Sequence, residues 1–502
     1  MLYAALAHTS QQLVETSSRK KKVELLARVL GDTAGDEPAI AARHLSGEVG
    51  HKLGIGYATV GELRGQVAAA AEPSLTVAEV DRRFAAIAEA RGAGSARAKR
   101  DAFAAMLAAA TAAEQAFLSA LVVGELRQGA LDALVVDAIA ARTGLPPGAV
   151  RSAYMLAGDI GDVARAALAD GAAGLARFGL TIFRPVLPML AQTAERAADA
   201  ITAFAGPAAL ELKLDGFRVQ VHKDGDAIRA YSRALNDVTS QVPEVVAAVA
   251  ALPARRLILD GEASAFGEAG RPLPFQDTMR RHGPLRLSLF DALLVDDQTL
   301  LATPARERFA ALSELAPALV VPRLVTADPD AANAYFEDAV ARGHEGIMAK
   351  ALDAPYDAGN RGAAWLKIKK VHHLDLVVLA VEWGSGRRRG WLSNIHLGAR
   401  DPAGGWVMLG KTFKGMTDEM LAWQTAELLA REVDRDGHIV YVRPEIVAEI
   451  AFNDVQRSTR YPGGFALRLA RVVRYRPDKT ADQADTIDAV RAIAIRDGVV
   501  PE

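Results

Sequence analysis

Residues 210–221 read LELKLDGFRVQV, and they decide the fold of the central part of this chain. Apolar and polar side chains alternate up to Gly216, and after it the alternation changes phase. A period of two is typical of a strand with one buried face. An Asp-Gly pair between two such runs is typical of a tight turn or a bulge. The segment therefore predicts two consecutive strands with a break at Asp215-Gly216.

The residues around this segment, from about 205 to 373, predict a mixed α+β domain. Apolar runs with the length of strands are interleaved with stretches that have helical spacing. The expected strands cover 257–266, 287–295, 345–350 and 365–369, and the expected helices cover 243–251, 304–316 and 329–342.

The chain before this domain predicts an all-helical region. Alanine and leucine dominate residues 1 to about 170, and apolar residues recur at spacings of three and four, as in 101–121. Pro146-Pro147 separates two helices, and Pro185 and Pro188 mark a linker.

The chain after residue 374 predicts a β domain. Five strand-like runs at 375–383, 393–399, 405–413, 439–443 and 446–452 are interrupted after the third by a helix at about 417–431. That element order is typical of an OB-fold barrel, and a short helix is expected in 481–502. The predicted fold is therefore multidomain: an all-α domain with its connector (1–190), an α+β domain (191–373) and a β OB-fold domain (374–502).

Composition excludes several classes of protein. With 502 residues of which 50% are hydrophobic, the chain can bury several cores and is not disordered throughout. A net charge of −2 argues against a protein coated in positive charge, and the absence of cysteine excludes disulfides, thiolate nucleophiles and cysteine zinc sites. There is no basic stretch ahead of a long apolar run at the N-terminus and no apolar run of about 18 residues. The chain is expected to be cytoplasmic, without a membrane.

Lysine is rare, because only 14 of the 59 basic residues are lysine, so the segments that keep it are candidates for chemistry. Glu211 and Lys213 leave the same face of a strand, a pattern that on its own is most often a salt bridge. Asp260 and Glu262 flank a glycine at the end of a buried strand, where a turn is the usual explanation.

Three further segments carry charged or aromatic residues in strand-like contexts. Phe290 closes an apolar run, where core packing is the ordinary role, and Glu345 and Lys350 lie at opposite ends of a short strand. Lys367 and Lys369 share a face, where two ammonium groups repel unless an anion lies between them. Residues 468–479 carry a net charge of +4, which by itself indicates a solvated basic edge.

Together these segments resemble, in order and residue types, the covalent nucleotidyltransferase superfamily, and most closely ATP-dependent DNA ligases of the bacterial and archaeal three-domain type. The signature lysine-x-Asp-Gly alone is weak, but six motifs in the family's order are specific. They are Lys213-Leu214-Asp215-Gly216, Asp260-Gly261-Glu262, Phe290-Asp291, 345–350, 365–370 and 474–479. Residues 124–130 and 184–191 resemble the family's helical DNA-binding domain and its connector.

The resemblance implies ATP as the AMP donor, Mg²⁺ as the metal and three displacements at phosphorus. Lys213 would take AMP from ATP, pass it to the 5′-phosphate of a nick in duplex DNA, and the 3′-hydroxyl would then displace AMP. By position match, Phe290 would stack on adenine, Glu262 would hold the ribose, and Lys367 would meet the α-phosphate. The other residues expected around the nucleotide are Glu211, Arg218, Arg233, Arg361 and Lys369, and the expected metal ligands are Glu345 and Asp260.

The resemblance also assigns the basic segment and the partners. Arg471, Arg474, Arg476, Asp478 and Lys479 would orient pyrophosphate during self-adenylation, which requires the C-terminal domain to swing onto the active site and away again. The protein would act as a monomer on DNA without sequence preference, associated with the nucleoid when on DNA, and the family works in replication, repair and recombination.

Two alternatives remain beside a DNA ligase. An RNA ligase or a capping-type guanylyltransferase shares the lysine motif, although the roughly 200 residues ahead of Lys213 argue against both. A non-catalytic nucleic-acid-binding scaffold would fit if a key residue were missing, and none is missing.

Overall fold

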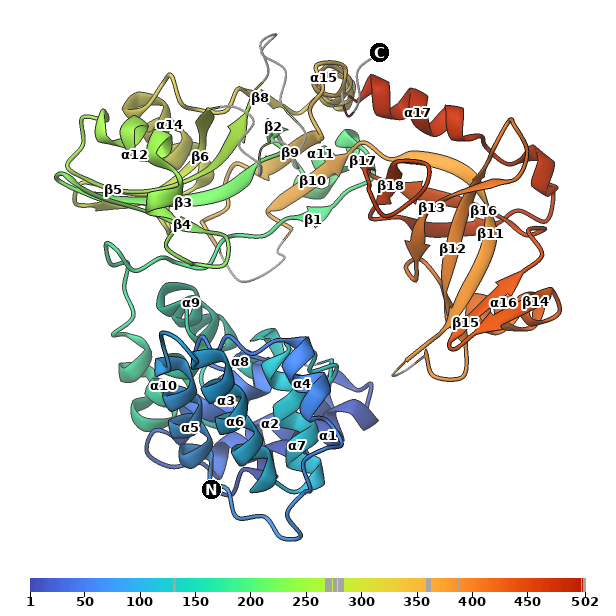
Figure 1. Ribbon diagram of the computed structural model, residues 1–502. Coiled ribbons are helices and arrows are strands. Elements are labelled where there is room, and N and C mark those ends of the chain that lie inside the picture. Colours follow the sequence, from blue (N-terminus) through green and yellow to red (C-terminus); the bar gives the residue numbers. More distant parts are fainter. Residues whose placement is uncertain are drawn as a thin grey trace.

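A computed structural model describes residues 1–129, 132–266, 273, 278, 284–357, 363–385, 388–497 and 499. Figure 1 shows three bodies: a helical one at the bottom, an α+β one at the upper left and a β-rich one at the right. We call them the helical region, the central region and the C-terminal region.

The helical region is built from ten helices, and in the described part of residues 1–175 every regular element longer than a single bridge is a helix. This confirms the all-α prediction. Phe84 and Phe103 are fully buried in its core, and α9 begins at Pro147 as expected. The helices are α1 (Ala4–Glu15), α2 (Arg19–Gly31), α3 (Glu37–Ser46), α4 (Tyr57–Leu63), α5 (Val77–Glu89), α6 (Ser95–Ala108), α7 (Ala112–Val122), α8 (Asp132–Thr143), α9 (Pro147–Ala157) and α10 (Ile160–Leu175).

The proline-marked linker after α10 is bound to the central region. Val186 exchanges two hydrogen bonds with the side chain of Gln220, at 2.8 and 3.1 Å. Val186 and Met189 are buried against Ile258 and neighbouring apolar residues. The linker therefore acts as a fixed support for the central region.

The central region consists of two five-stranded sheets with the orders β1-β10-β9-β2-β8 and β4-β3-β5-β6-β7. The first sheet contains β1 (Gln192–Thr193), β2 (Ala208–Lys213), β8 (Arg323–Thr326), β9 (Gly346–Ala351) and β10 (Trp365–Lys369). The second contains β3 (Phe217–Asp224), β4 (Ala227–Ser232), β5 (Arg256–Ala265), β6 (Leu285–Val295) and β7 (Gln298–Thr299). The helices are α11 (Ala197–Phe204), α12 (Pro243–Ala250), α14 (Ala305–Leu315) and α15 (Pro329–Ala341).

The predicted break at Asp215-Gly216 is the point where the chain passes from one sheet to the other. β2 pairs with β8 and β9, whereas β3 pairs with β4 and β5. A Cβ on Gly216 would lie 2.3 Å from the carbonyl oxygen of Ala263, so the crossing needs glycine because of close backbone approach. The strands were predicted correctly, but alternation alone did not show that they belong to different sheets.

The C-terminal region is a β domain with the sheet path β13-β12-β11-β15-β14, to which β16 and β19 are added through β11. Its elements are β11 (His372–Trp383), β12 (Leu392–Arg400), β13 (Trp406–Thr412), α16 (Asp418–Leu429), β14 (Glu432–Asp436), β15 (Ile439–Val442), β16 (Val447–Phe452), β17 (Asp454–Arg457), β18 (Phe465–Arg468), β19 (Arg471–Tyr475) and α17 (Ile487–Arg496). The helix after the third strand is present as expected. Four of these strands, β14, β17, β18 and β19, were not predicted, because short exposed strands carry little apolar alternation.

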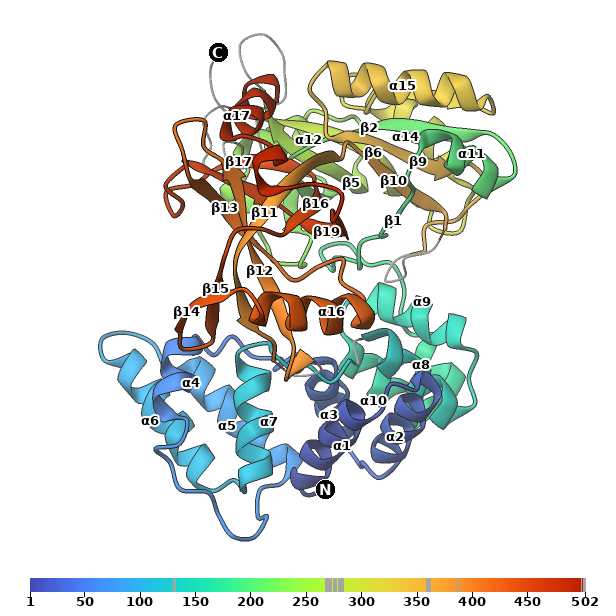
Figure 2. The same ribbon diagram turned by 90° about the vertical axis from the view of Figure 1, so that its right-hand side faces the viewer.

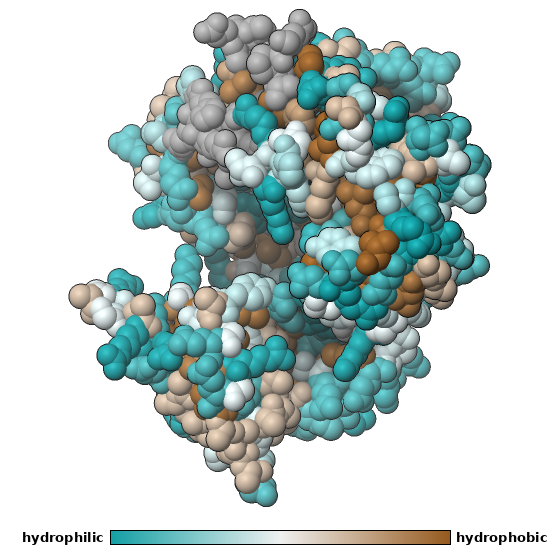
Figure 3. Space-filling model, turned by 45° about the vertical axis from the view of Figure 1, so that its right-hand side comes forward, coloured by the Kyte–Doolittle hydropathy of each residue, from teal (hydrophilic) through white to brown (hydrophobic). Residues whose placement is uncertain are grey.

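The C-terminal region is connected to the central region by a short segment and also contacts the helical region. β10 ends at Lys369 and β11 begins at His372, so two residues connect the central and C-terminal regions. Figure 2 shows α16 and β14 directly above the helical region, and the Arg127 side chain there donates a hydrogen bond of 2.9 Å to Ser385. A cavity of about 1570 Å³ lies between these two regions, lined by residues that include Gln11, Glu125, Glu382 and Phe413. Figure 3 shows the hollow between the helical region and the regions above it.

Among the described residues, none of the helices has both the length and the apolar character needed to cross a membrane.

Candidate active site

Lys213 lies at the end of β2, next to the point where the chain changes sheets. The antiparallel register of β2 and β9 places Lys213 opposite Gly346, so Glu345, one residue earlier, comes next to the lysine. Glu345 forms ion pairs with both Lys213 and Lys369. Burial alone would raise the pKa of Glu345, but the two ammonium groups more than offset it and hold that pKa below its usual value. One carboxylate thus holds two lysines from β2 and β10, the two strands that flank β9.

Gly346 makes this arrangement possible. Its φ of +145° is one that side chains rarely adopt, and a Cβ there would lie 2.1 Å from the carbonyl oxygen of Ile368. β9 and β10 therefore approach closely at this residue. This brings Lys369, at the end of β10, to the same carboxylate as Lys213.

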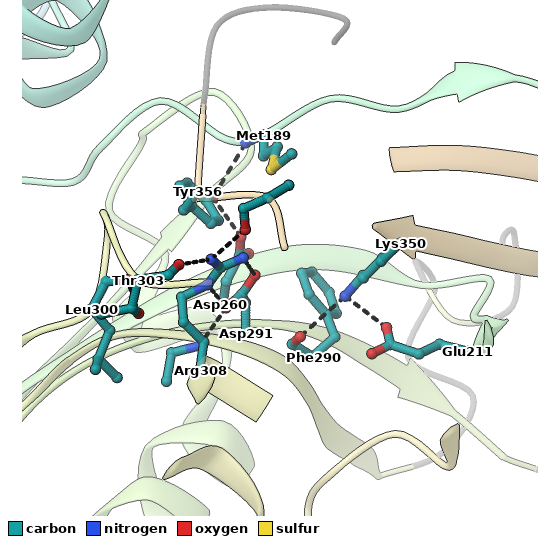
Figure 4. Close-up of polar contacts among 12 residues, drawn as sticks. Met189, Glu211, Asp260, Phe290, Asp291, Leu300, Thr303, Arg308, Lys350 and Tyr356 are labelled. Atoms are coloured by element: carbon teal, nitrogen blue, oxygen red, sulfur yellow. Dashed lines mark hydrogen bonds and ion pairs between the residues drawn. The ribbon is translucent and has the colours of Figure 1, made fainter. Parts of the chain in front are cut away.

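Glu211 shares a strand with Lys213 but pairs with other cations. Its carboxylate accepts from Arg323, with the Nε at 2.8 Å, and lies 2.6 Å from Lys350 Nζ. Lys350 also donates to the carbonyl oxygen of Phe290 at 3.1 Å, as Figure 4 shows. Its ammonium lies 4.7 Å from the Phe290 ring centre and 4.4 Å from that of Trp365. Burial lowers the pKa of Lys350.

Arg218 and Asp260 form a second buried ion pair beside these rings. Arg218 reaches Asp260 at 2.5 Å, and the hydroxyl of Tyr356 donates to the same carboxylate at 2.7 Å. The Arg218 guanidinium lies 5.3 Å from the Phe290 ring centre, and Phe290 meets Trp365 edge-on at 5.9 Å. The two rings and the guanidinium form one face of the site.

Two carboxyl groups near Lys213 have raised pKa values. Burial raises the pKa of Glu262 to about 7, although the charges of Lys213 and Arg218 act in the opposite direction. Burial and the nearby Glu345 raise the pKa of Asp215. Perturbed acids next to a lysine are typical of a site that carries chemistry.

Asp291 lies beside the site and pairs with a buried arginine. It is fully buried together with Arg308 from α14, and the Nε of Arg308 lies 2.7 Å from the carboxylate. Arg308 also donates to the carbonyl oxygens of Thr303 and Ala354. Figure 4 shows this ion pair on the Tyr356 and Asp260 side of the site. Arg308 could not be selected from its sequence context, because a single arginine in a helix is usually exposed.

Three predicted residues of the central region remain: Lys367, Arg233 and Arg361. Lys367 lies on β10 and is half-buried, between the paired strands β1 and β9. Arg233 is exposed in the turn that follows β4. Arg361 lies outside the described residues.

The predicted basic segment makes its described ion pairs within the C-terminal region. Arg474 pairs with Glu449 at 2.7 Å. Arg476 pairs with Asp375 at 3.0 Å and with Asp478 at 2.7 Å, and Lys479 also pairs with Asp375. Arg471 is half-buried at the start of β19, which pairs with β16. None of these ion pairs reaches Lys213.

Another arginine of the C-terminal region does approach Lys213. Arg468, at the end of β18, lies 3.9 Å from Asp215 and 3.5 Å from Asp454. These residues and Glu345 line a cavity of about 310 Å³ at the junction of the two regions. Arg468 was noted in the sequence only as one member of a basic segment, since nothing local indicates that it faces a different region.

The carboxylates of the described residues do not form a complete metal site by themselves, since no group of three or more histidines and acids is placed to hold an ion. Glu345 is the acid directly bonded to Lys213. Both oxygens of Asp260 are already engaged, by Arg218 and Tyr356.

Comparison with known proteins covers almost the whole chain. Three family models match: DNA ligase N terminus over residues 57–140, ATP dependent DNA ligase domain over 188–369, and ATP dependent DNA ligase C terminal region over 388–479. A probable DNA ligase of Anaeromyxobacter dehalogenans (strain 2CP-C) is 56% identical, with 98% of this chain and 99% of the relative aligned. A probable DNA ligase of Streptomyces griseus is 51% identical, with 98% of this chain and 99% of the relative aligned.

Solved structures show a similar fold. Pmar-Lig_Pre and Pmar-Lig_PreS3 have TM-scores of 0.62 and 0.60 at 19% identity, and each comparison covers 94% of this chain and 99% of the solved chain. The three family models match in order along the chain. The relatives match it over almost its whole length. The chain belongs to the ATP-dependent DNA ligase family.

Proposed function

We propose that this ligase seals nicks in duplex DNA and that Lys213 is the residue that carries AMP. The observation that carries the proposal is the pairing of Lys213 with Glu345 at a cavity between the central and C-terminal regions. In the first step the Lys213 amine attacks the α-phosphorus of ATP, a phosphoramidate bond forms, and pyrophosphate leaves. AMP then passes to the 5′-phosphate of the nick, and the 3′-hydroxyl displaces it.

Glu345 acts in this scheme as an anchor for the amine. Its oxygen accepts a hydrogen bond from Lys213, which fixes the direction of the nitrogen. Its lowered pKa keeps it ionised beside the two ammonium groups, and the proton that the amine must lose passes to solvent. Lys369, on the other oxygen, supplies a positive charge close to the reacting phosphate.

The nucleotide is proposed to lie against the face made by Phe290 and Trp365, with adenine stacked on Phe290. Glu262 accepts hydrogen bonds from the ribose hydroxyls, and Lys367 meets the α-phosphate. Glu211 acts indirectly, because it holds Lys350 against the carbonyl of Phe290. Arg218, Arg233 and Arg361 complete the proposed set of nucleotide-binding residues.

Mg²⁺ is the proposed metal. The described residues do not offer a complete set of ligands for it, so substrate phosphates and water would supply the rest. Mg²⁺ is commonly held by one or two carboxylates together with substrate phosphates and water, and Glu345 would have to release Lys213 or Lys369 to supply one of them. Asp260 would have to release Arg218 or Tyr356 to contribute a second. The metal would supply positive charge for the phosphates.

We infer domain limits of 1–190, 191–373 and 374–502, with an OB-fold barrel in the last. The barrel is supported by the pairing of β11 with β12, β15 and β16 and by α16 after the third strand. Arg471, Arg474, Arg476, Asp478 and Lys479 are proposed to orient pyrophosphate in the first step. The ion pairs of Arg474, Arg476 and Lys479 lie within the C-terminal region, so this role requires a rotation about the two-residue connection.

The helical and C-terminal regions are proposed to hold duplex DNA through its phosphates, without reading the bases. The cavity between them and the Arg127 contact to Ser385 support an arrangement that can close around a substrate. We propose that one copy of the chain is sufficient.

The test uses protein stripped of bound AMP with pyrophosphate. A nicked DNA duplex, a nicked RNA duplex and single-stranded RNA are each offered with ATP, NAD or GTP, with Mg²⁺ or with a chelator. Sealing of nicked DNA with ATP and Mg²⁺ alone is the expected result. Turnover on RNA ends would favour an RNA ligase, transfer of GMP would favour a capping enzyme, and no labelling with any nucleotide would favour a scaffold.

A further inference from the structure

The carboxylate of Asp497, near the C-terminal end of the chain, bonds the connection between the central and C-terminal regions. Only Lys370 and Val371 separate β10 from β11. Asp497, directly after α17, lies 2.6 Å from Lys370 Nζ and 2.9 Å from His372 Nε2. Its oxygens therefore bind one residue of the connection and the first residue of β11. We call this group the hinge clamp.

The position of Asp497 is unfavourable for its helix. The C-terminus of a helix carries partial negative charge and favours cations, so a carboxylate there is destabilising. Here Lys370 and His372 compensate for it and hold the pKa of Asp497 below its usual value, against the effect of burial. Arg496 also approaches His372, at 3.2 Å from Nδ1. The two hinge contacts of Asp497 are shorter than its 3.7 Å approach to Arg496 of its own helix, so Asp497 is bonded mainly by the hinge.

The clamp joins two different rigid bodies. α17 belongs to the C-terminal region, because Ile487, Val490 and Ala494 are buried in the core of that region. Lys370 belongs to the central region, because its backbone N–H donates to the carbonyl oxygen of Glu345 at 3.1 Å. A rotation of the C-terminal region must therefore move Asp497 relative to Lys370.

The clamp is also close to the reacting groups. Glu345, to which Lys370 is bonded, is the carboxylate that holds Lys213 and Lys369. In the clamped orientation Arg468 approaches Asp215, while Arg474 and Lys479 are paired inside the C-terminal region. This orientation therefore excludes the basic segment from the site and brings a different arginine to it.

We propose that Asp497 is a positioning residue of the ligation reaction. Its bonds to Lys370 and His372 favour the orientation of the C-terminal region that is used in the DNA-dependent steps. Asp497 must release Lys370 before self-adenylation. The equilibrium between two orientations shifts by the free energy of any contact present in only one of them. Removing the clamp should then help one step and harm the others.

The kinetic test compares wild type, Asp497→Asn and Asp497→Glu in two single-turnover reactions: lysyl–AMP formation from ATP without DNA, and sealing of a nick whose 5′-phosphate already carries AMP. Asp497→Asn is expected to accelerate the first and slow the second. The loss of one hydrogen bond to a charged group shifts the equilibrium between the two orientations by about tenfold, so the two factors should multiply to about ten. Asp497→Glu keeps the charge and should fall closer to wild type. Asp488→Asn, on the exposed face of the same helix, is the matched control and should change neither step.

The direction of these effects separates positioning from simple destabilisation. A general loss of structure would slow both steps, and that outcome, or no change in either, overturns the inference. The kinetic test rests on the proposed role of residues 471–479, so the double variant Arg474→Ala with Lys479→Ala is measured in parallel. Normal lysyl–AMP formation by that variant would reject the role of the segment, without reference to the clamp.

A distance measurement tests the clamp independently of the basic segment. The chain has no cysteine, so spin labels can be attached at Glu337→Cys on α15 and Asp436→Cys on β14, both exposed positions. With Asp497 present the distance distribution should be narrow. With Asp497→Asn a second, separate population is expected, and an unchanged distribution would show that Asp497 does not hold the hinge.

Discussion

The carboxyl group of Glu262 shows how burial prepares a single side chain for binding. Its pKa of about 7 means that near neutral pH it exists in both protonated and ionised forms. The folded-state pKa lies above the ordinary value, so the group is protonated below about pH 7 and ionised above it. Only the ionised form is purely an acceptor, with two oxygens for the two ribose hydroxyls.

We therefore expect the KM for ATP in self-adenylation to fall as the pH rises from about 6 to about 8. Glu262→Gln keeps the shape of the side chain but cannot ionise, so its KM should be higher at the upper pH and independent of pH in this range. Asp226→Asn, at an exposed position, serves as the control and should keep the wild-type slope. A Glu262→Gln variant with the same slope as wild type would remove Glu262 from this role.

Sequence reasoning at this scale could select Lys213 as the candidate reactive lysine but could not identify the partners of the charged groups. Lys213 was selected because it belongs to a motif and because lysine is rare in the chain. Glu211 shares a strand face with Lys213, a pattern that is most often a salt bridge, yet its ion pairs are with Lys350 and Arg323. Those partners come from other strands, and only the register of the folded sheet brings them together.

At the scale of elements, α14 is fixed to β6 by the buried pair of Arg308 and Asp291. Both side chains are fully buried, and each is the compensating charge for the other. Loss of one partner leaves an uncompensated charge in the interior, which is much more costly than loss of an exposed pair.

Arg308→Ala is expected to lower the free energy of unfolding of the central region by about 3–5 kcal/mol. Arg306→Ala, on the same helix, removes a half-exposed partner of Asp353 and should cost less than about 1 kcal/mol. Urea denaturation followed by intrinsic fluorescence measures both. Equal and small effects of the two variants would mean that the buried pair does not support the site.

Most central strands and helices were predictable, because their apolar period is clear. β8 and β4 were not predicted, although β4 forms one edge of the second sheet and β8 one edge of the first. In the C-terminal region, β19 was read only as a basic segment. Its side chains alternate poorly in hydropathy, and its pairing with β16 is a tertiary contact that the local sequence does not encode.

At the scale of the whole molecule, the position of the C-terminal region decides which of its positive charges lie near Asp215. In this structure Arg468 lies near Asp215, whereas Arg474 and Lys479 are paired with Glu449 and Asp375. The order of the three regions along the chain could be read from the sequence. Their orientation could not, because it depends on a few contacts between distant residues, such as Arg127 with Ser385.

The basic segment provides the prediction at this scale. Arg474→Ala combined with Lys479→Ala should slow lysyl–AMP formation by orders of magnitude, since each contact to a leaving group is worth about 2–4 kcal/mol in the transition state. The same variant should seal a pre-adenylated nick at nearly the normal rate at low and at moderate salt.

The control for this prediction is Arg435→Ala with Arg443→Ala, which removes two exposed arginines of the same region. If residues 474 and 479 instead hold the DNA backbone, self-adenylation will be normal and sealing of the pre-adenylated nick will become strongly dependent on salt. Measurement of both steps at two salt concentrations distinguishes the two roles.

The most direct test of the account is the site of covalent AMP. Wild type, Lys213→Ala and Lys213→Arg are incubated with [α-³²P]ATP and Mg²⁺, the labelled peptide is mapped, and nicked duplex DNA is then added. The account predicts label on Lys213 alone, transfer of that label to DNA followed by sealing, and no label on either variant, because a guanidinium stays protonated and is a poor nucleophile. Label on Lys213→Ala, or a labelled peptide that contains Lys350, Lys367 or Lys369 in place of Lys213, would contradict it.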